Sequence, residues 1–363
     1  MSKLPFRYTL TVTDNQSGRT IRSLLQHELQ FSTRLQRNPV FREQVRCNDR
    51  PAFLHERIKP GDILSVPLPP EVTSVALEPT PIDICYEDDQ VLVINKSAGI
   101  LTHPSARERQ GSLLAAVAAY LHPLGQVPHC VHRLDRETSG VVMFARHAHF
   151  HHLFDVCLRD GKMHRSYCAL VRPPKPRRIS LNLPMLSVET GQDTWQTIDL
   201  NIGQDPQRPS RRVIMAQGQR AITHFRVLAR TDTAWLVGVH LETGRTHQIR
   251  LHFAAVGMPL LGDFVYGDRQ ETNLWKQETN LFTPVSKSGF DGAKMDPALQ
   301  FLIPNEIHRG RQALHAVRLS WQDPVTGTSR QADAPVAQDL KQLWQSHGGA
   351  ANVWQDVQNS LLD

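Results

Sequence analysis

Short apolar runs of strand length are the feature that most constrains the fold of this chain. They occur at 91–94 (VLVI), 141–145 (VVMFA), 166–171 (SYCALV) and 234–241 (AWLVGVHL). Runs of this length beside turn residues such as Gly140 are typical of buried β-strands. The strands outnumber the helices and do not alternate with them. The pattern therefore predicts an α+β fold rather than a doubly wound parallel sheet.

Two helices are predicted, one between these strands and one after the last of them. The segment 111–122 (GSLLAAVAAYLH) is rich in Ala and Leu, and Ser112 can cap its start. The segment 246–257 (THQIRLHFAAVG) places apolar residues on one helical face, with Thr246 as the expected N-cap and Gly257 as the stop.

The 363 residues suit about two domains. We expect a small domain at 1–70, a proline-rich linker at 71–83, a main domain at 84–330 and a helical tail at 331–363. Two polar segments within the main domain, about 173–217 and 269–312, are expected to be loop-rich insertions.

The small domain begins with a helical pattern at 21–29 and ends with a short strand at 63–66, after a Pro-Gly-Asp turn. Between them lies a window rich in arginine, in which Pro39 excludes one continuous helix.

The formal net charge of +6 and the isoelectric point near 9.2 suit a polyanionic partner such as nucleic acid. No stretch is apolar and long enough to cross a membrane, and the first residues do not resemble a signal peptide. The five cysteines are odd in number and show no C-x-x-C spacing. These features predict a cytoplasmic protein with reduced thiols.

The segment 131–140 (VHRLDRETSG) places one carboxylate, Asp135, between Arg133 and Arg136 and just before a strand. An Asp in such a position is most often a turn residue. A neighbouring cation can also keep the carboxylate ionised, so that it acts as a nucleophile or a base.

A second segment, 242–250 (ETGRTHQIR), carries Arg245 at a turn before the second helix. Arg245 and Arg250 beside a helix N-terminus can hold a phosphate or a carboxylate, although a surface arginine is the simpler interpretation. In a third segment Tyr167 follows Arg165 and is expected to begin a strand. Such a tyrosine is usually half-buried core, but it can also stack on a base.

Histidine is abundant, with eighteen residues, but the patterns of metal sites are missing. There is no H-E-x-x-H and no paired C-x-x-C, and His247 and His252 are five residues apart and do not share a helical face. No glycine-rich phosphate loop occurs either. We expect neither a metal nor a nucleotide cofactor.

Three segments together resemble the pseudouridine synthases that modify large-subunit ribosomal RNA and some tRNAs. They are 86–105 (YEDDQVLVINKSAGILTHPS), 132–140 (HRLDRETSG) and 242–267 (ETGRTHQIRLHFAAVGMPLLGDFVYG). The stretches 219–228 and 312–327 are similar to two further strands of that family. The resemblance implies an α+β fold with a central mixed, mostly antiparallel sheet. It also implies isomerisation of uridine in rRNA or tRNA without metal or cofactor.

The same resemblance implies roles for individual residues. Asp135 matches the essential aspartate, Arg245 the arginine that pairs with it, and Tyr167 the tyrosine that stacks on the uracil. Arg133 matches an arginine associated with holding the flipped-out site. Further substrate contacts are expected from Thr138, Arg165, His247 and Arg250.

The N-terminal segment resembles a small α/β RNA-binding domain that is shared with a ribosomal small-subunit protein. The resemblance rests on 21–29, 31–37 (FSTRLQR) and 58–66 (IKPGDILSV). It implies RNA contacts from Arg34, Arg37 and Arg42. The alternative is a solvated basic face, since phosphate contacts alone carry no sequence information.

Two other functions remain open at this point. One is a catalytically silent RNA-binding or ribosome-assembly factor on the same fold, although such a protein has no chemical reason to keep Asp135, Tyr167 and Arg245 together. The other is a hydrolase that uses Asp135 or a histidine-bound metal, which the missing metal spacing disfavours. Whichever of these functions the protein has, we expect it to be a monomer.

Overall fold

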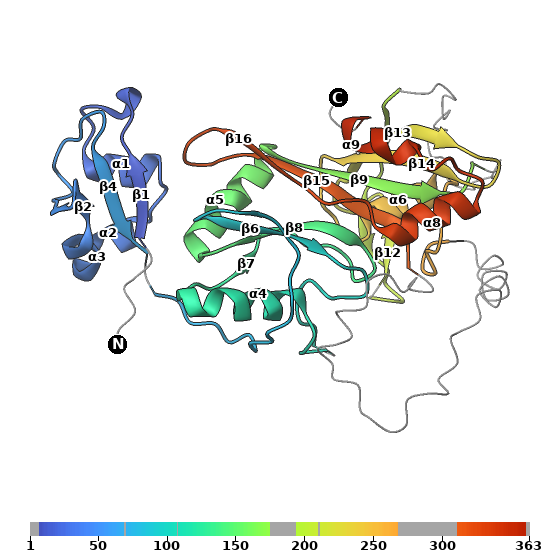
Figure 1. The fold of residues 1–363 in the computed structure, drawn as a ribbon, viewed down its shortest axis with the longest axis horizontal. Helices are drawn as coiled ribbons and strands as arrows, with labels where there is room; N and C mark the ends of the chain where they lie inside the picture. The colour runs from blue at the N-terminus through green and yellow to red at the C-terminus, as the bar shows by residue number, and fades with distance from the viewer. Residues whose placement is uncertain are drawn as a thin grey trace.

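Two main sheets organise the protein, a small one near the N-terminus and a large one in the rest of the chain (Figure 1). The structure is a computed structural model and describes residues 7–68, 70–106, 108–174, 194–209, 211–267 and 311–360. Most of the expected insertion at 269–312 lies outside these residues. The insertion at 173–217 contains strands as well as loops in its described part.

The N-terminal unit is a four-stranded sheet with the order β1-β4-β2-β3 and three short helices. Its elements are β1 (Arg7–Thr11), β2 (Arg46–Cys47), β3 (Arg50–Pro51), β4 (Ile63–Pro67), the 3-10 turn η1 (Asp14–Gln16), α1 (Ile21–His27), α2 (Thr33–Arg37) and α3 (Pro39–Gln44). Helix α2 ends at Arg37, and Pro39 is the first residue of α3. A proline is tolerated there because the first helical position loses no hydrogen bond. The Asn38 side chain caps the new helix by accepting from the Phe41 N–H.

The large sheet has ten strands and confirms the expected mixed, mostly antiparallel architecture. Its main path runs β10 (Gln196–Asp199), β13 (Ile222–Arg230), β14 (Trp235–Leu241), β9 (Met163–Val171), β15 (Leu314–Gln322), β8 (Ser139–Ala145), β6 (Val91–Lys96) and β5 (Ile84–Glu87). β16 (Ser329–Asp333) pairs with β15, and β7 (His129–Cys130) pairs with β8. The contact between β8 and β15 is parallel, and the other pairs along the path are antiparallel. The strands β11 (Ile202–Gln204) and β12 (Arg212–Ile214) form a separate hairpin.

Helices cover both faces of the large sheet. They are α4 (Leu113–Leu121), the 3-10 turn η2 (His122–Leu124), α5 (Ala148–Arg159), α6 (Gln248–Ala255), α8 (Gln338–Ser346) and α9 (Val353–Ser360). Side chains alternate along β9, so that Tyr167 belongs to one core cluster and Cys168 to the other. Leu340 and Trp344 of α8 pack into the Cys168 cluster and are each only 2% exposed. The tail helix α8 therefore contributes to the core, and Tyr167 faces away from it.

Three boundaries differ from expectation. β16 extends to Asp333, so the expected start of the tail at 331 falls inside a strand. Tyr167 lies in the middle of β9 rather than at its start, because the strand begins at Met163. Helix α6 begins at Gln248, since His247 has a left-handed backbone (φ 59°) and Thr246 is not the cap.

The N-terminal unit packs against α5 through aromatic side chains. Phe31 stacks on His149 with ring centroids 4.0 Å apart, and Tyr8 meets the edge of Phe150 at 5.4 Å. Glu71, in the segment that joins the two units, accepts hydrogen bonds from the Ala148 N–H. Among the described residues, no helix is long and apolar enough to cross a membrane.

Candidate active site

Asp135 lies in the loop between β7 and β8, and hydrogen bonds from two sides fix the backbone of this loop. The Thr102 hydroxyl donates to the Leu134 carbonyl at 2.8 Å and accepts from the Leu134 N–H at 3.3 Å. The buried Lys96 ammonium donates to the carbonyls of Arg136, Ser97 and Ile100 at 2.8–2.9 Å. Because Lys96 has its three donors occupied by carbonyls, it acts as a clamp on the loop.

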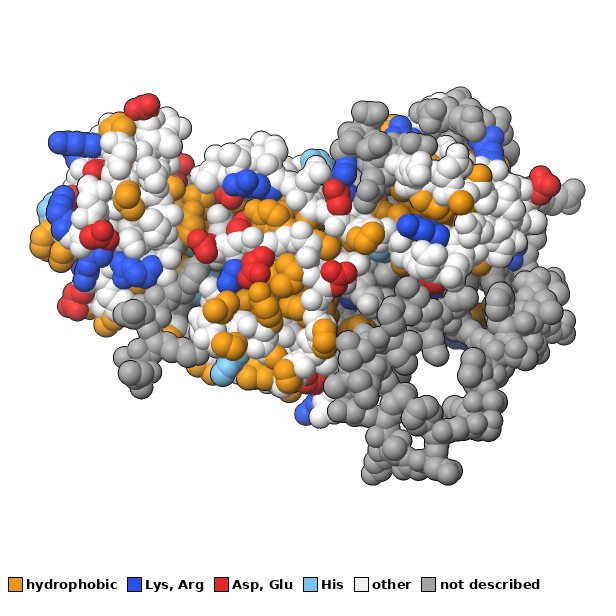
Figure 2. All heavy atoms as spheres, in the orientation of Figure 1, with side chains coloured by type: hydrophobic (Ala, Val, Ile, Leu, Met, Phe, Trp, Pro, Cys, Tyr) orange, Lys and Arg blue, Asp and Glu red, His pale blue; other side chains and the backbone are white. Residues whose placement is uncertain are grey.

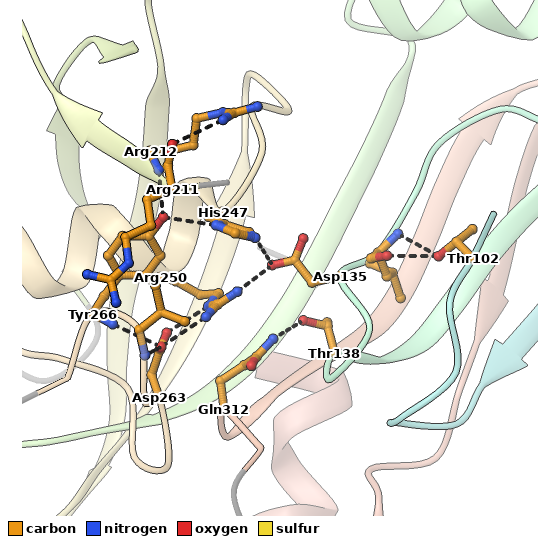
Figure 3. Close-up of polar contacts among 12 residues, drawn as sticks. Thr102, Asp135, Thr138, Arg211, Arg212, His247, Arg250, Asp263, Tyr266 and Gln312 are labelled. Carbon is orange, nitrogen blue, oxygen red and sulfur yellow. Dashed lines mark hydrogen bonds and ion pairs between the residues drawn. The ribbon is translucent and has the colours of Figure 1, made fainter. Parts of the chain in front are cut away.

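The far side of the loop is held by residues just before β15. Gln312 donates to the Thr138 hydroxyl at 3.0 Å (Figure 3), and Arg311 donates to the Glu137 carbonyl at 3.2 Å. Gly140 follows, with φ 110°, where β8 meets β15. A Cβ there would lie 2.1 Å from the Ala316 carbonyl oxygen, so only glycine permits this parallel pairing. The residues after Asp135 therefore anchor the loop to the sheet.

Arg250 of α6 is the main partner of the Asp135 carboxylate. Its Nη1 donates to Asp135 Oδ2 at 3.1 Å, and its other donors form a two-pronged contact with Asp263 at 2.7 and 2.9 Å (Figure 3). The Asp135 side chain is 22% exposed. Oδ1 of Asp135 has no hydrogen-bond partner within the described parts of the chain. One carboxylate oxygen is thus held in place while the other remains open.

The charges of this group stabilise one another. Burial alone would raise the pKa of Asp263, but the hydrogen bonds and charge of Arg250 lower it below its usual value. Burial alone would lower the pKa of Arg250, but its two carboxylate partners raise it. Asp263 therefore stays ionised and fixes the arginine that orients Asp135.

His247 provides a second, weaker contact. Its Nε2 lies 3.8 Å from Asp135 Oδ2, and its Nδ1 lies 2.9 Å from the Tyr266 hydroxyl. That hydroxyl also accepts from the Arg212 N–H at 3.0 Å. Burial lowers the pKa of His247, against the opposing charge of Asp135. His247 therefore lies between the Asp135 carboxylate and the Tyr266 hydroxyl.

A single pocket collects most of the expected site residues. Asp135, Thr138, His247 and Arg250 line it together with Arg133, Arg165, Tyr167 and Arg245. Tyr167 is 4% exposed, and burial raises the pKa of its phenol. Residues from three regions that are distant in sequence, the β7–β8 loop, β9 and the start of α6, therefore meet at one place.

The expected pairing of Arg245 with Asp135 is wrong in its geometry. Arg245 is exposed and its Nε donates to the Arg220 carbonyl at 3.2 Å. Arg250 makes the contact instead, because it lies within the helix on the side that faces the loop, whereas Arg245 precedes the helix. Arg245 still lines the pocket.

The three arginines that were expected to contact RNA lie outside the pocket. Arg34, Arg37 and Arg42 are exposed on α2 and α3, and Figure 2 shows Lys and Arg side chains on the outer surface of that unit. Within the described residues no group of three His, Cys, Asp or Glu side chains could hold a metal ion.

Sequence reasoning missed Lys96, Asp263 and Tyr266. All three lie in segments that carry the family resemblance, which is the signal that could have indicated them. Asp263 and Tyr266 contact Arg250 and His247 of the same segment, and Lys96 contacts the Arg136 carbonyl of another. Only the folded structure shows these contacts.

The fold and the site define a pseudouridine synthase, and the chain belongs to the RNA pseudouridine synthase family. The family model described as RNA pseudouridylate synthase matches residues 90–255, which include Asp135, Tyr167 and Arg250. The protein is therefore an isomerase that converts uridine to pseudouridine in RNA.

Two relatives illustrate the extent of the similarity. An uncharacterized RNA pseudouridine synthase of Bacillus subtilis is 31% identical and aligns over 93% of this chain and 96% of its own length. The ribosomal large subunit pseudouridine synthase D of Escherichia coli is 29% identical over 92% of each chain. Among solved structures, human RNA Pseudouridylate Synthase Domain Containing 1 is 20% identical with a TM-score of 0.48, covering 77% of this chain and 98% of its own.

Proposed function

We propose that the protein isomerises specific uridines of large-subunit ribosomal RNA, with Asp135 as the catalytic carboxylate. The assignment rests on the contacts of the two carboxylate oxygens of Asp135. One of its oxygens is held by Arg250 at 3.1 Å, and the other has no hydrogen-bond partner among the described residues, in a pocket that Tyr167 also lines. A carboxylate that a guanidinium holds by one oxygen, with the other oxygen open to the pocket, is suited to act on a substrate carbon or proton.

The target base must leave the helical stack before it reaches this pocket, at a cost of a few kcal/mol. Arg133 is exposed at the pocket and is suited to hold the flipped-out site. Asp135 then engages the nucleotide and the glycosidic bond breaks. The uracil turns and forms a new bond to the ribose through carbon five. Carbon five then loses its proton to solvent and N1 gains one, so that the product is an isomer of uridine. Tyr167 is suited to stack on the ring.

The identity of the RNA rests on relatives and on charge. Several relatives are named ribosomal large subunit pseudouridine synthase D. The exposed Arg34, Arg37 and Arg42 of the N-terminal unit supply cations for the phosphate backbone. We infer a cytoplasmic monomer that needs neither a metal nor a cofactor, with tRNA as the second candidate substrate.

The test is tritium release from RNA labelled at carbon five of uridine, with the purified protein and an rRNA transcript. We expect Asp135→Asn to lower the rate by about 1000-fold or more, because the amide cannot replace the carboxylate. Asp155→Asn, a change of the same type at an exposed position of α5, should keep the rate.

Two outcomes would contradict the proposal. An inactive wild-type protein on both rRNA and tRNA would favour a silent RNA-binding factor. An Asp135→Asn variant as active as the wild type would remove Asp135 from the reaction. Release that persists in EDTA is the result expected for an enzyme without a metal.

A further inference from the structure

Arg165 is the one buried arginine of the pocket lining that forms no hydrogen bond or ion pair with any described residue. It is only 8% exposed, and its buried Nε has no hydrogen-bond partner. Arg133 and Arg245 are exposed and can be solvated, and Arg250 is paired with two carboxylates. A buried guanidinium without a partner is costly, so its persistence in a pocket indicates a missing anion.

The position of Arg165 follows from the strand and from a neighbouring glycine. Arg165 and Tyr167 are two residues apart on β9 and therefore face the same side of the sheet, toward the pocket. The guanidinium lies against Gly244, where a Cβ would be 2.5 Å from Nη1 and 3.3 Å from Cζ. Gly244 has no left-handed backbone, so the glycine matters here for the space that it leaves to the guanidinium and not for its conformation.

We propose that Arg165, seated on Gly244, is a subsite for a backbone phosphate of the RNA next to the flipped uridine. The inference rests on the proposed function, since it assigns a substrate group to that pocket. A phosphodiester carries a full negative charge and two free oxygens, which match the planar fork of a guanidinium. A neutral uracil carbonyl would leave the charge uncompensated.

The location of the subsite determines which phosphate of the RNA it binds. Arg165 lines the same pocket as Asp135, but Asp135 is held by Arg250 and makes no ion pair with Arg165. The bound phosphate is therefore one that flanks the reacting nucleotide. Phosphate contacts fix register and carry no sequence information, so Arg165 positions the nucleotide over Asp135 without choosing the base.

The experiment compares substrate RNAs in which a single phosphate on either side of the target uridine is replaced by an uncharged methylphosphonate. With the wild-type protein, one of the two replacements should lower kcat/KM by about 10- to 100-fold, as for loss of one charged hydrogen-bonded contact. With Arg165→Met, the unmodified RNA should already show that loss. The methylphosphonate should then cost no more than about twofold, since the contact it removes is absent.

Gly244→Ala provides a variant that keeps every charge. Its new methyl group displaces the guanidinium, so it should reproduce the loss in kcat/KM and the insensitivity to the methylphosphonate. Arg159→Met, which removes an exposed arginine of α5, is the matched control and should behave as the wild type. Circular dichroism and the unfolding midpoint of each variant separate a lost contact from a lost fold.

The outcomes are distinct. If each methylphosphonate lowers kcat/KM by the same factor in Arg165→Met as in the wild type, the phosphate subsite is refuted. Arg165 then contacts another part of the substrate. If the wild-type protein releases no tritium from any RNA, the proposed function itself fails, whatever the variants do.

Discussion

At the scale of single residues, the site depends on which arginine faces Asp135. The sequence offers Arg245 and Arg250 within one short segment, and both can bind a carboxylate. The choice depends on where the helix begins. The left-handed His247 delays the start of α6 to Gln248 and places Arg250, rather than Arg245, toward the loop. Helical spacing alone predicted the helix but not its first residue.

The first prediction concerns these two arginines. Arg250→Met removes the group that orients Asp135, so kcat should fall by about 100-fold or more while RNA affinity changes little. Arg245→Met removes an exposed guanidinium, and its loss of kcat should be about tenfold or less. Tritium release under saturating RNA, with filter binding for affinity, measures both. A larger loss of kcat in Arg245→Met would reverse the assignment.

The second prediction separates stability from activity. Arg250→Met leaves the buried Asp263 without its partner, which should lower the free energy of unfolding by about 3–5 kcal/mol. Adding Asp263→Asn removes the stranded charge, so the double variant should regain much of that stability but none of the activity. Urea unfolding followed by circular dichroism measures the first effect and tritium release the second. A double variant less stable than Arg250→Met would argue that Asp263 is already neutral.

At the scale of elements, the loop that bears Asp135 is held by parts of the chain that are distant in sequence. Arg311 donates to the Glu137 carbonyl and forms an ion pair with Asp339 of α8. Within this pair, Nη2 of Arg311 donates to Oδ1 of Asp339 at 2.7 Å. The tail helix therefore supports, through Arg311, the loop that bears Asp135. The sequence predicted the helix from its pattern, but it could not show this role, because Arg311 and Glu137 are 174 positions apart.

The third prediction follows from this support. Asp339→Asn weakens the ion pair and lets Arg311 move, so kcat should fall about threefold to tenfold with KM unchanged. The free energy of unfolding should fall by about 1–3 kcal/mol, as for a buried charged hydrogen bond. Gln342→Ala, an exposed change on the same helix, is the control. An Asp339→Asn variant with lower stability and an unaltered kcat would make α8 a purely structural element.

At the scale of the whole molecule, composition and pattern predicted the class of the fold well and its arrangement poorly. The apolar runs at 91–94, 141–145 and 234–241 are strands β6, β8 and β14, as expected. Their order in the sheet was not predictable, because β15 joins the sheet between β8 and β9 from far along the chain. Strand pairing depends on long-range packing that no local pattern encodes. The contact of Phe31 with His149 between the two units is also a long-range contact, so no local pattern predicts it either.

Three histidines buried as neutral side chains give the molecule an acid-sensitive interior. His252 donates from Nε2 to the Leu200 carbonyl and accepts at Nδ1 from the Thr223 hydroxyl, both at 2.9 Å. Nε2 of His132 accepts from the Met143 N–H, so it cannot carry a proton. Burial lowers the pKa of His132 and His315 to about 3 and that of His252 to about 4. Burial thus disfavours the charged form of all three side chains.

The fourth prediction is a loss of stability in mild acid. The pKa of these histidines is about 6.5 when unfolded and lower when folded, so the unfolded chain binds more protons between pH 6.5 and about 4. Their contribution is complete above pH 6.5 and falls with pH by about 1.4 kcal/mol per unit for each histidine. Urea unfolding at pH 7.5, 6.5 and 5.5 measures the slope. His252→Gln keeps a donor and an acceptor but does not titrate, so it should reduce the slope by one histidine's share. An unchanged slope in His252→Gln would mean that His252 is protonated in the folded protein, against the hydrogen bond that its Nδ1 accepts from Thr223.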